Sequence, residues 1–309
     1  MPELPEVQTV VSDLNKKIVG DTITDFWSDW PKTIKDANSG KPASSADKFK
    51  KEIKSRKILK VRRIGKNIFI DLAGNPHYLE RGKKTIYIHL KMTGHLLVKT
   101  AKTKNNYFNE RVNQYIHHIW KLKTKNKKLK TLEFSDLRKF GKIVLVDTDK
   151  LEELKEIKEL GIDVMDNKFT FQKFDEILEK KSAYGRSAYG GKKIRDILMN
   201  QHIIAGIGNI YLSEILFDAG IMPTSLTWKL SFQVRKKLYN SIRKILEKAI
   251  KLRGTSDSDY RDTSGAPGKF QKVLKVYQHE GQKCLKCDTI IKRVKMGQRS
   301  VFYCSKCQK

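Results

Sequence analysis

Four cysteines near the C-terminus place the strongest constraint on how this chain can fold. They form two Cys-x-x-Cys pairs, Cys284 with Cys287 and Cys304 with Cys307, separated by sixteen residues. Paired motifs at this spacing match a tetrahedral site for one zinc ion, whereas two disulfides would require an oxidising compartment. Because four thiolates would fill the coordination sphere, such a zinc ion would be structural. We therefore expect a zinc site that organises the end of the chain.

The residues between the two cysteine pairs predict a β-hairpin. Residues 289–295 and 300–303 alternate in polarity like strands, with residues 296–298 as the turn. Arg299 lies beside this turn, where zinc and sheet would hold its side chain at a rigid tip. Such a side chain suits contact with a phosphate or a nucleic-acid groove, although an ordinary exposed arginine would look the same.

The charge of the chain predicts a polyanionic partner. Among 309 residues, 64 are Lys or Arg and 34 are Asp or Glu, which gives a net charge of +30. Nucleic acid is the simplest such partner, and an anionic membrane surface is the competing one. However, no apolar run approaches the ~18–20 residues of a membrane-spanning helix. No signal peptide or lipidation motif is found either, so we expect no membrane association.

Hydrophobic periodicity changes near residue 149. Helical spacing over residues 4–18 is followed by short strand-like segments without intervening helices, which predicts an antiparallel sandwich. These segments are residues 58–61, 67–72, 85–90, 95–98, 114–122, 129–134 and 143–146. Helical patterns follow at residues 151–160, 171–178, 192–200, 209–219 and 230–252.

The first six residues, MPELPE, suggest chemistry as well as structure. If Met1 is removed, Pro2 carries a secondary amine that titrates near pH ~8. Such an amine can attack an aldehyde-like carbon and form an iminium ion, the electron sink that lysine Schiff-base enzymes use. Glu3 and Glu6 lie within reach for proton transfer. The competing interpretation is an ordinary helix start, with proline in the first turn and acids facing the helix dipole.

Six motifs in order extend this pattern over nearly the whole chain. They are residues 2–7, 65–67, 89–94, 136–141, 206–211 and 298–299 together with the four cysteines. In this combination the chain resembles the formamidopyrimidine-DNA glycosylases, bacterial oxidised-purine repair enzymes related to endonuclease VIII. The resemblance implies a bifunctional DNA glycosylase and apurinic/apyrimidinic lyase of base excision repair. Its substrate would be 8-oxoguanine or formamidopyrimidine in duplex DNA, excised through a Schiff base on the N-terminal proline and β,δ-elimination.

The resemblance implies a role for each matching residue near the N-terminus. Pro2 would be the nucleophile, Glu3 the acid/base group at the sugar, and Glu6 would orient or proton-couple the N-terminus. Lys66 would be an active-site cation that contacts the DNA backbone near the lesion. A solvated turn lysine is the simpler interpretation of Lys66.

A second set of residues would replace the flipped base. The resemblance implies that Met92, Arg138 and Phe140 fill the gap, pair with the widowed base and wedge between bases. Core packing is the alternative for Met92 and Phe140, although their polar neighbours indicate loop tips. Lys139 would contact a phosphate.

The chain departs from the family pattern at three positions of these two loops. Leu137 stands where the family usually has proline, and Lys139 where it usually has arginine, which loses the bidentate fork. Lys91 occupies a glycine-type position before the methionine and could alter the shape of the wedge.

For the C-terminal half, the resemblance implies a helix-two-turn-helix module around residues 202–208. Gly208 would allow a tight turn next to a phosphate, and Asn209 would bind that phosphate at the start of the next helix. A simple N-cap is the alternative for Asn209. The loop over residues 254–268 would cover the flipped base and set the lesion preference.

Together these features predict an α+β protein. We expect an N-terminal antiparallel β-sandwich with a flanking helix over residues 2–149, a helix-two-turn-helix domain over 150–270 and a zinc-ribbon finger over 271–309. The expected protein is a monomeric, cytoplasmic, nucleoid-associated bacterial enzyme on double-stranded DNA that contains an oxidised base or abasic site. Open alternatives are the endonuclease VIII-like preference for oxidised pyrimidines, a non-catalytic DNA-binding protein, and RNA binding.

Overall fold

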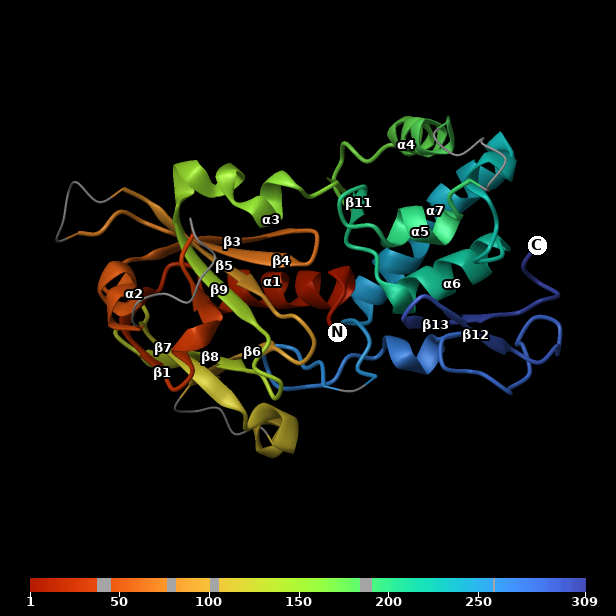
Figure 1. The fold of residues 1–309 in the computed structure, drawn as a ribbon. Coiled ribbons are helices and arrows are strands. Elements are labelled where there is room, and N and C mark those ends of the chain that lie inside the picture. Colours follow the sequence, from red (N-terminus) through yellow and green to blue (C-terminus); the bar gives the residue numbers. More distant parts are fainter. Residues whose placement is uncertain (38–45, 77–81, 101–105, 184–190, 258) are drawn as a thin grey trace. The chain divides into compact units, whose positions relative to one another are not determined.

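The computed structural model describes residues 1–37, 46–76, 82–100, 106–183, 191–257 and 259–309, which form two compact units (Figure 1). Unit 1 contains residues 1–159 and 252–271, and unit 2 contains residues 160–251 and 272–309. A late segment of the chain therefore returns to the N-terminal unit. The expected division at residues 149 and 270 stays a prediction.

In the described part of the chain, unit 1 is built from two β-sheets. One has the order β1 (Thr22–Ser28), β7 (Ile116–Lys123), β8 (Leu129–Ser135), β6 (His95–Thr100), with antiparallel neighbours throughout. The other has the order β2 (Ile34–Lys35), β9 (Lys142–Asp147), β5 (Lys84–His89), β4 (Asn67–Leu72), β3 (Ile58–Ile64), and its β2–β9 pair is parallel. This architecture confirms the predicted fold class.

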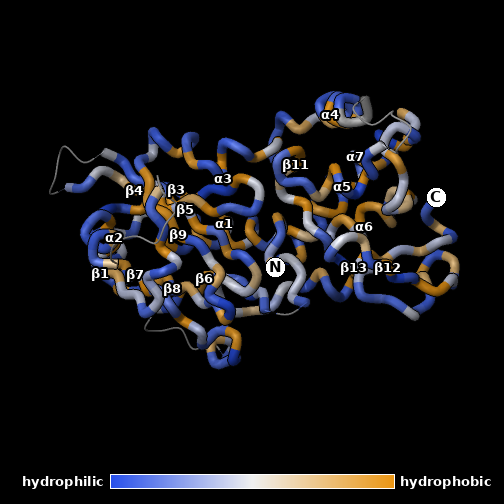
Figure 2. The backbone as a smooth tube through the Cα atoms, in the orientation of Figure 1, coloured by the Kyte–Doolittle hydropathy of each residue, from blue (hydrophilic) through white to orange (hydrophobic). Residues whose placement is uncertain are grey.

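Helix α1 (Leu4–Ile18) has the predicted bounds and anchors the N-terminus in the core. Its apolar side, Val7, Val10, Leu14 and Ile18, is fully buried among residues of both sheets. Hydrophobic residues recur along α1 and the strands around it (Figure 2). Because each such side chain contributes about 1.5–3 kcal/mol when buried, the start of the chain is firmly held.

The sequence did not reveal two other elements of unit 1. Strand β1 carries a register shift between Ile23 and Asp25, which disturbs the alternation that would mark a strand. Helix α2 (Ala46–Ile53) is short and buries only Phe49 and Ile53. Both segments pack on the same core as α1.

The continuous helix predicted over residues 151–160 is wrong. The chain forms a 3₁₀ helix over Thr148–Glu153 and a one-turn helix α3 (Lys155–Lys158), with Leu154 in an extended conformation between them. This break lets Leu151 and Leu154 pack together on the outer face of the second sheet, beside Phe69. Tertiary packing therefore overrides the local helical pattern.

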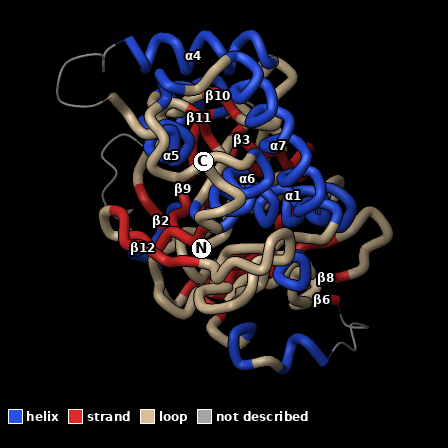
Figure 3. Tube along the Cα trace, turned by 90° about the vertical axis from the view of Figure 1, so that its right-hand side faces the viewer, coloured by secondary structure: helices blue, strands red, loops and turns tan. Residues whose placement is uncertain are grey.

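Unit 2 is mainly helical (Figure 3). It contains α4 (Phe171–Ala183), α5 (Ile194–Met199), α6 (Asn209–Ala219) and α7 (Phe232–Lys251), with a short parallel pair β10 (Ile162–Asp163) and β11 (Ile204–Ala205). Helix α7 is amphipathic and begins two residues later than predicted. Helix α6 is buried on nearly every side, as expected for a central helix.

The zinc-ribbon hairpin joins α6 in unit 2. Strands β12 (Lys292–Met296) and β13 (Arg299–Tyr303) are antiparallel, and Gly297 supplies a positive φ of 62° at the first turn position, as in a type II′ turn. Phe302 of the hairpin and Phe217 of α6 belong to the same buried cluster. Among the described residues, no helix combines the length and apolar character needed to span a membrane.

Candidate functional site

Pro2, Glu3 and Glu6 lie at the buried start of α1. Glu3 is the N-cap residue, and its carboxylate accepts the backbone N–H of Glu6. In return, the N–H of Glu3 donates to Oε2 of Glu6 at 2.7 Å. Pro2 is buried, and Glu3 and Glu6 are only 3% and 1% exposed. The residues therefore do form a helix start, with a reciprocal capping box, and this arrangement is compatible with the chemical role.

The Glu6 carboxylate has a second partner, which the sequence did not reveal. The backbone N–H of Thr255 donates to Oε1 of Glu6 at 2.7 Å, and the Tyr260 hydroxyl lies 3.4 Å from the Glu6 carbonyl oxygen. Both partners belong to the segment 252–271 of unit 1. No sequence signal could have found this contact, because every residue except proline carries a backbone N–H.

Lys66 lies in a tight turn between β3 and β4. Ile64 pairs with Asn67, and Gly65 has a φ of 58°. Lys66 is only 7% exposed, so the interpretation as a solvated turn lysine is wrong. Arg63 ties the turn to α1, because its guanidinium donates to the Gly65 carbonyl and to the Gln8 side chain, both at 2.8 Å.

Lys66 lies next to the end of β5, because the following residue, Asn67, pairs with His89. Burial, followed by the positive charges of Lys91 and Lys66, lowers the pKa of His89 to about 3. His89 is therefore neutral at physiological pH, and its ring accepts the backbone N–H of Lys91 at 2.9 Å.

Met92, Arg138 and Phe140 meet at the tips of two loops, and we call these three residues the wedge cluster. Arg138 Nη1 lies 3.1 Å from the Met92 sulfur, and the guanidinium lies 4.8 Å from the centre of the Phe140 ring. Met92 is 41% exposed and Phe140 is 53% exposed. Core packing is therefore excluded for both residues.

A buried carboxylate, Asp136, holds the two loops of the wedge cluster together. Its Oδ1 accepts the Thr93 hydroxyl at 2.5 Å, and its Oδ2 accepts the Gly141 N–H at 2.7 Å. The Thr93 hydroxyl oxygen also accepts the N–H of Arg138 at 3.0 Å. Asp136 is 1% exposed, so the exposed side chains rest on a buried polar network that the sequence did not reveal.

The ring of Phe134 forms the floor beneath both loops. A Cβ atom on Gly94 would lie 2.9 Å from this ring, and one on Gly141 would lie 2.5 Å from it. Phe134 itself is fully buried. Both motif glycines are therefore needed because the backbone of each loop approaches one aromatic ring closely.

The Lys139 side chain contacts Trp30, a residue outside the six motifs. Its ammonium lies 4.3 Å from the centre of the Trp30 ring, and Lys32 lies 5.3 Å from the same ring. Lys139 and Lys91 both adopt left-handed backbone conformations, with φ of 56° and 55°. This geometry explains why a glycine-type residue suits position 91.

Asn209 connects the start of α6 to the hairpin strand that carries Arg299. Gly208 is the N-cap of α6, so the N-cap interpretation of Asn209 is wrong. The Asn209 side chain instead donates to the carbonyl of Ser300 at 2.9 Å, next to the exposed Arg299. Gly208, the predicted turn glycine, has an extended conformation with φ of −128°, and the positive φ of this loop, 115°, occurs at Gly206.

Glu214 makes a second connection from α6 and was missed in the sequence. It is 2% exposed and accepts the backbone N–H groups of Lys275, Val276 and Tyr277 at 2.9–3.1 Å. Burial raises the pKa of the Glu214 carboxyl, while the three N–H groups oppose that rise. A glutamate in the middle of a mostly apolar helix was the sequence signal that could have revealed it.

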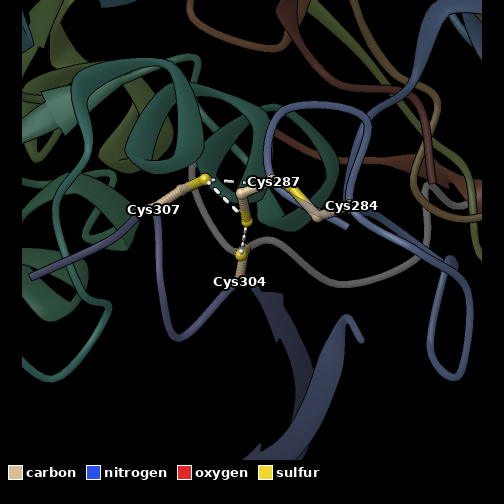
Figure 4. A group of neighbouring side chains, drawn as sticks. All are labelled: Cys284, Cys287, Cys304 and Cys307. Atoms are coloured by element: carbon tan, nitrogen blue, oxygen red, sulfur yellow. Dashed lines mark hydrogen bonds between the residues drawn. The ribbon is translucent and has the colours of Figure 1, made fainter. Parts of the chain in front are cut away.

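The four cysteines form one cluster, in which their sulfur atoms face one another (Figure 4). All four Sγ atoms lie within 4.8 Å of one another, with contacts of 3.8, 3.4 and 3.3 Å. Zinc–sulfur bonds of about 2.3 Å in a tetrahedron would place the sulfurs about 3.8 Å apart. The cluster therefore fits one structural zinc ion, held by Cys284, Cys287, Cys304 and Cys307.

Comparisons with known proteins agree with this geometry over the whole chain. Family models match at residues 1–143 (formamidopyrimidine-DNA glycosylase N-terminal domain), 160–260 (its H2TH domain) and 281–309 (a zinc finger found in FPG and IleRS). Formamidopyrimidine-DNA glycosylases of Pelotomaculum thermopropionicum and Carboxydothermus hydrogenoformans are 36% and 35% identical over 309 residues. These alignments cover 100% of this chain and 99% and 100% of the relatives.

Solved structures give the same result. The Lactococcus lactis Fpg in complex with DNA that contains an abasic site matches with a TM-score of 0.78 and 30% identity. MutM in complex with DNA that contains carbocyclic 8-oxo-G matches with a TM-score of 0.79 and 29% identity. Both matches cover 100% of each chain. The chain therefore belongs to the formamidopyrimidine-DNA glycosylase family of DNA repair glycosylases with a zinc finger.

Proposed function

We propose that this protein is a bifunctional DNA glycosylase and apurinic/apyrimidinic lyase that removes oxidised purines from duplex DNA. The observation that carries this proposal is the fixed N-terminus, where Pro2 is buried beside Glu3 and Glu6 at the start of α1. The names of the relatives support formamidopyrimidine as a substrate, and the complex of MutM with 8-oxo-G DNA supports oxidised guanine.

The proposed reaction starts after Met1 is removed. The Pro2 nitrogen uses its lone pair to bond to C1′ of the lesion sugar, and the damaged base leaves with the electron pair of its glycosidic bond. The sugar ring then opens, and its O4′ takes a proton while an iminium ion forms between C1′ and Pro2. This cation acidifies the C2′ proton, so that β- and then δ-elimination break the bonds to the 3′ and 5′ phosphates. Water finally releases the sugar fragment from Pro2.

Two glutamates would serve this chemistry in different ways. Glu3 lies directly beside Pro2 and would move protons at the sugar, a contribution worth about 10²–10⁴-fold. Glu6 has both carboxylate oxygens bonded to backbone N–H groups, which supports an orienting role. Lys66 lies in a turn that Arg63 connects to α1, and it would contact the DNA backbone near the lesion.

The wedge cluster would hold the DNA open. Unstacking the lesion costs a few kcal/mol, and Met92, Arg138 and Phe140 present an apolar and planar surface that can fill the gap. Asn209 and Arg299 in unit 2, and Lys139 in unit 1, would bind backbone phosphates. Zinc would keep the hairpin rigid and take no part in the chemistry. We expect the enzyme to act as a monomer.

Borohydride trapping tests this proposal. Processed protein is mixed with a duplex that contains one 8-oxoguanine, borohydride reduces the iminium, and the cross-linked peptide is mapped. An adduct on Pro2 supports the proposed chemistry and substrate together. A matched protein with one extra N-terminal residue should bind the duplex and form no adduct.

The remaining outcomes separate the alternatives. An adduct only with an oxidised-pyrimidine duplex would favour the endonuclease VIII-like preference. Tight duplex binding without any adduct, from protein with a confirmed Pro2 terminus, would overturn the lyase and favour a non-catalytic DNA-binding protein. Tighter binding to RNA than to duplex DNA would favour the RNA-binding alternative.

A further inference from the structure

One carboxylate connects the peptide unit of the N-terminal proline to a distant loop. The N–H that donates to Oε2 of Glu6 belongs to the peptide bond between Pro2 and Glu3. The N–H that donates to Oε1 belongs to the peptide bond between Gly254 and Thr255. Both hydrogen bonds are 2.7 Å long and buried. The Glu6 side chain, which is only 1% exposed, therefore fixes the positions of the two peptide units relative to each other.

Gly254 is shaped to receive the Glu6 side chain. Its φ is +79°, and a Cβ atom at this position would lie 2.5 Å from Oε1 and 2.8 Å from Cγ of Glu6. From the other side, the Gly254 carbonyl accepts the N–H of Phe270 at 3.0 Å. A Cβ atom on Gly268 would lie 2.2 Å from that carbonyl oxygen. The backbone at Gly254 therefore cannot shift without moving Glu6 or the far end of the loop.

A second anchor fixes the same loop to α1. The Arg253 guanidinium donates to Asp13 of α1 at 2.5 and 3.2 Å and to Asp262 at 2.7 and 3.0 Å. The N–H of Lys269 also donates to the carbonyl of Leu252 at 2.9 Å. The base of the loop over residues 254–268 is thus attached to α1 at Asp13 and at Glu6.

From this geometry we propose that the peptide between Gly254 and Thr255 positions the Pro2 amine through Glu6. Because a peptide bond is planar, fixing the Glu3 N–H fixes the plane that carries the Pro2 Cα atom. A carboxylate with both oxygens bonded cannot rotate away, so the loop sets the direction of that plane. Any rearrangement of the loop around bound DNA is therefore transmitted to the nucleophile. This inference rests on the proposed function, because it assumes that the Pro2 amine reacts.

The test compares two glycine variants of the same loop. Gly254→Ala inserts a methyl group against Glu6, whereas Gly265→Ala has a similar φ of +76° and meets Asn113 and Phe108 instead. The substrate is a duplex with a preformed abasic site, which removes any need to recognise a base. The rate of borohydride-trapped adduct is measured at saturating DNA, and Kd is measured separately.

We expect Gly254→Ala to slow adduct formation by about tenfold or more, since small misplacements of a reacting group are costly. Its Kd should stay within about twofold, and Gly265→Ala should stay within about twofold in both measurements. Equal adduct rates for Gly254→Ala and wild type, with unchanged Kd, would overturn the inference. A similar loss in both variants would do the same, because it would indicate a general effect of the loop.

A double-mutant cycle asks whether the effect passes through Glu6. In a Glu6→Gln background, Gly254→Ala should add less than about twofold, because the connection is already broken. An undiminished effect in that background would contradict the inference.

If Gly254→Ala fails to fold, the wild-type protein still provides a test. Amide hydrogen exchange at Glu3 and Thr255 should change together when abasic-site DNA binds, and independent changes would overturn the inference. Absence of any wild-type adduct on Pro2 would instead show that the proposed function itself has failed.

Discussion

Two buried carboxylates, Glu6 and Asp136, organise the two parts of unit 1 that the proposed reaction uses, and their surroundings differ sharply. Each is 1% exposed and accepts hydrogen bonds from two separate segments of the chain. Around Glu6 the residues are buried, including Pro2 and Glu3. Around Asp136, Thr93 and Phe134 are buried, whereas the wedge cluster extends into solvent.

The difference indicates how a buried carboxylate with both oxygens hydrogen-bonded can serve two purposes. A nucleophile must be oriented and shielded, so the carboxylate lies next to the reacting residue. A wedge must enter the DNA stack, so its side chains are exposed while their loops are braced from beneath. Both carboxylates fulfil their role because both oxygens are bonded, and an unpaired donor at such a site is expensive.

At neutral pH, the largest expected effect comes from Asp136→Asn. The amide can accept only one of the two donors, Thr93 and Gly141, so the unfolding free energy should fall by about 2–3 kcal/mol. Urea unfolding measures this change. Asp147→Asn is the control, because that carboxylate is 42% exposed and should cost less than about 1 kcal/mol. A loss below about 0.5 kcal/mol for Asp136→Asn would contradict the bracing role.

Glu6→Gln is the matched change in the other region. We expect a comparable loss of stability, but the two variants should differ in their functional defects. Asp136→Asn should weaken binding to lesion-containing duplex, and Glu6→Gln should slow the adduct without weakening binding. The same defect in both variants would remove the functional distinction between the two regions.

Phe140→Ala should leave stability nearly unchanged and impair DNA opening. The ring is 53% exposed, so the unfolding free energy should change by less than about 0.5 kcal/mol. Loss of a stacking surface worth about 1–3 kcal/mol should weaken binding to abasic-site duplex by about fivefold or more. Fluorescence anisotropy gives Kd, with Leu129→Ala, at the other end of β8, as the exposed control. Equal Kd values for the two variants would contradict the wedge role.

Sequence reasoning succeeded where the signal was local or repeated. The apolar spacing from Val7 to Ile18 predicted α1, the cysteine spacing predicted the zinc site, and the alternation between the cysteine pairs predicted the hairpin. All three patterns are local in the sequence. The resemblance brought Met92, Arg138 and Phe140 together, although they come from two loops. None of these predictions depended on a long-range polar contact.

The sequence failed where a buried carboxylate binds a distant segment of the chain. Glu6 and Glu214 accept backbone N–H groups of remote residues, and Asp136 accepts the hydroxyl of the remote Thr93. Trp30 was missed for a related reason, since its contact with Lys139 depends on how a strand end meets a loop. Such contacts are properties of the tertiary fold.

Acid should destabilise the floor of the wedge loops through His118. Burial, followed by the charge of His117, lowers the pKa of His118 to about 3, although Asp29 opposes this. Between pH ~6.5 and 3 the unfolded chain binds a proton that the folded protein does not. The free energy of unfolding therefore falls as the pH falls, by up to about 1.4 kcal/mol per pH unit. The ring stacks on Phe134 at 5.8 Å, directly beneath the wedge loops.

The measurement compares wild type with His118→Phe, which keeps an aromatic ring against Phe134. Urea unfolding between pH 6 and 4 should show a shallower pH dependence in the variant, by the equivalent of about one proton. Identical slopes would show that His118 does not control this acid sensitivity. Hydrogen exchange at Gly141 should then be measured, because acid should expose that amide before the Glu3 amide.

The smallest expected effect is a gain from Lys91→Gly. Lys91 has a φ of 55°, a conformation that costs a side-chain residue about 1–2 kcal/mol, while glycine loses about 0.5–1 kcal/mol of that gain through unfolded-state entropy. The variant should therefore be more stable by about 0.5–1 kcal/mol in urea unfolding. Met92 should remain in contact with Arg138, because Thr93 and Asp136 hold the adjacent backbone. A loss of stability would mean that the Lys91 side chain itself supports the loop. The residues that support the wedge cluster would then include Lys91 as well as Asp136.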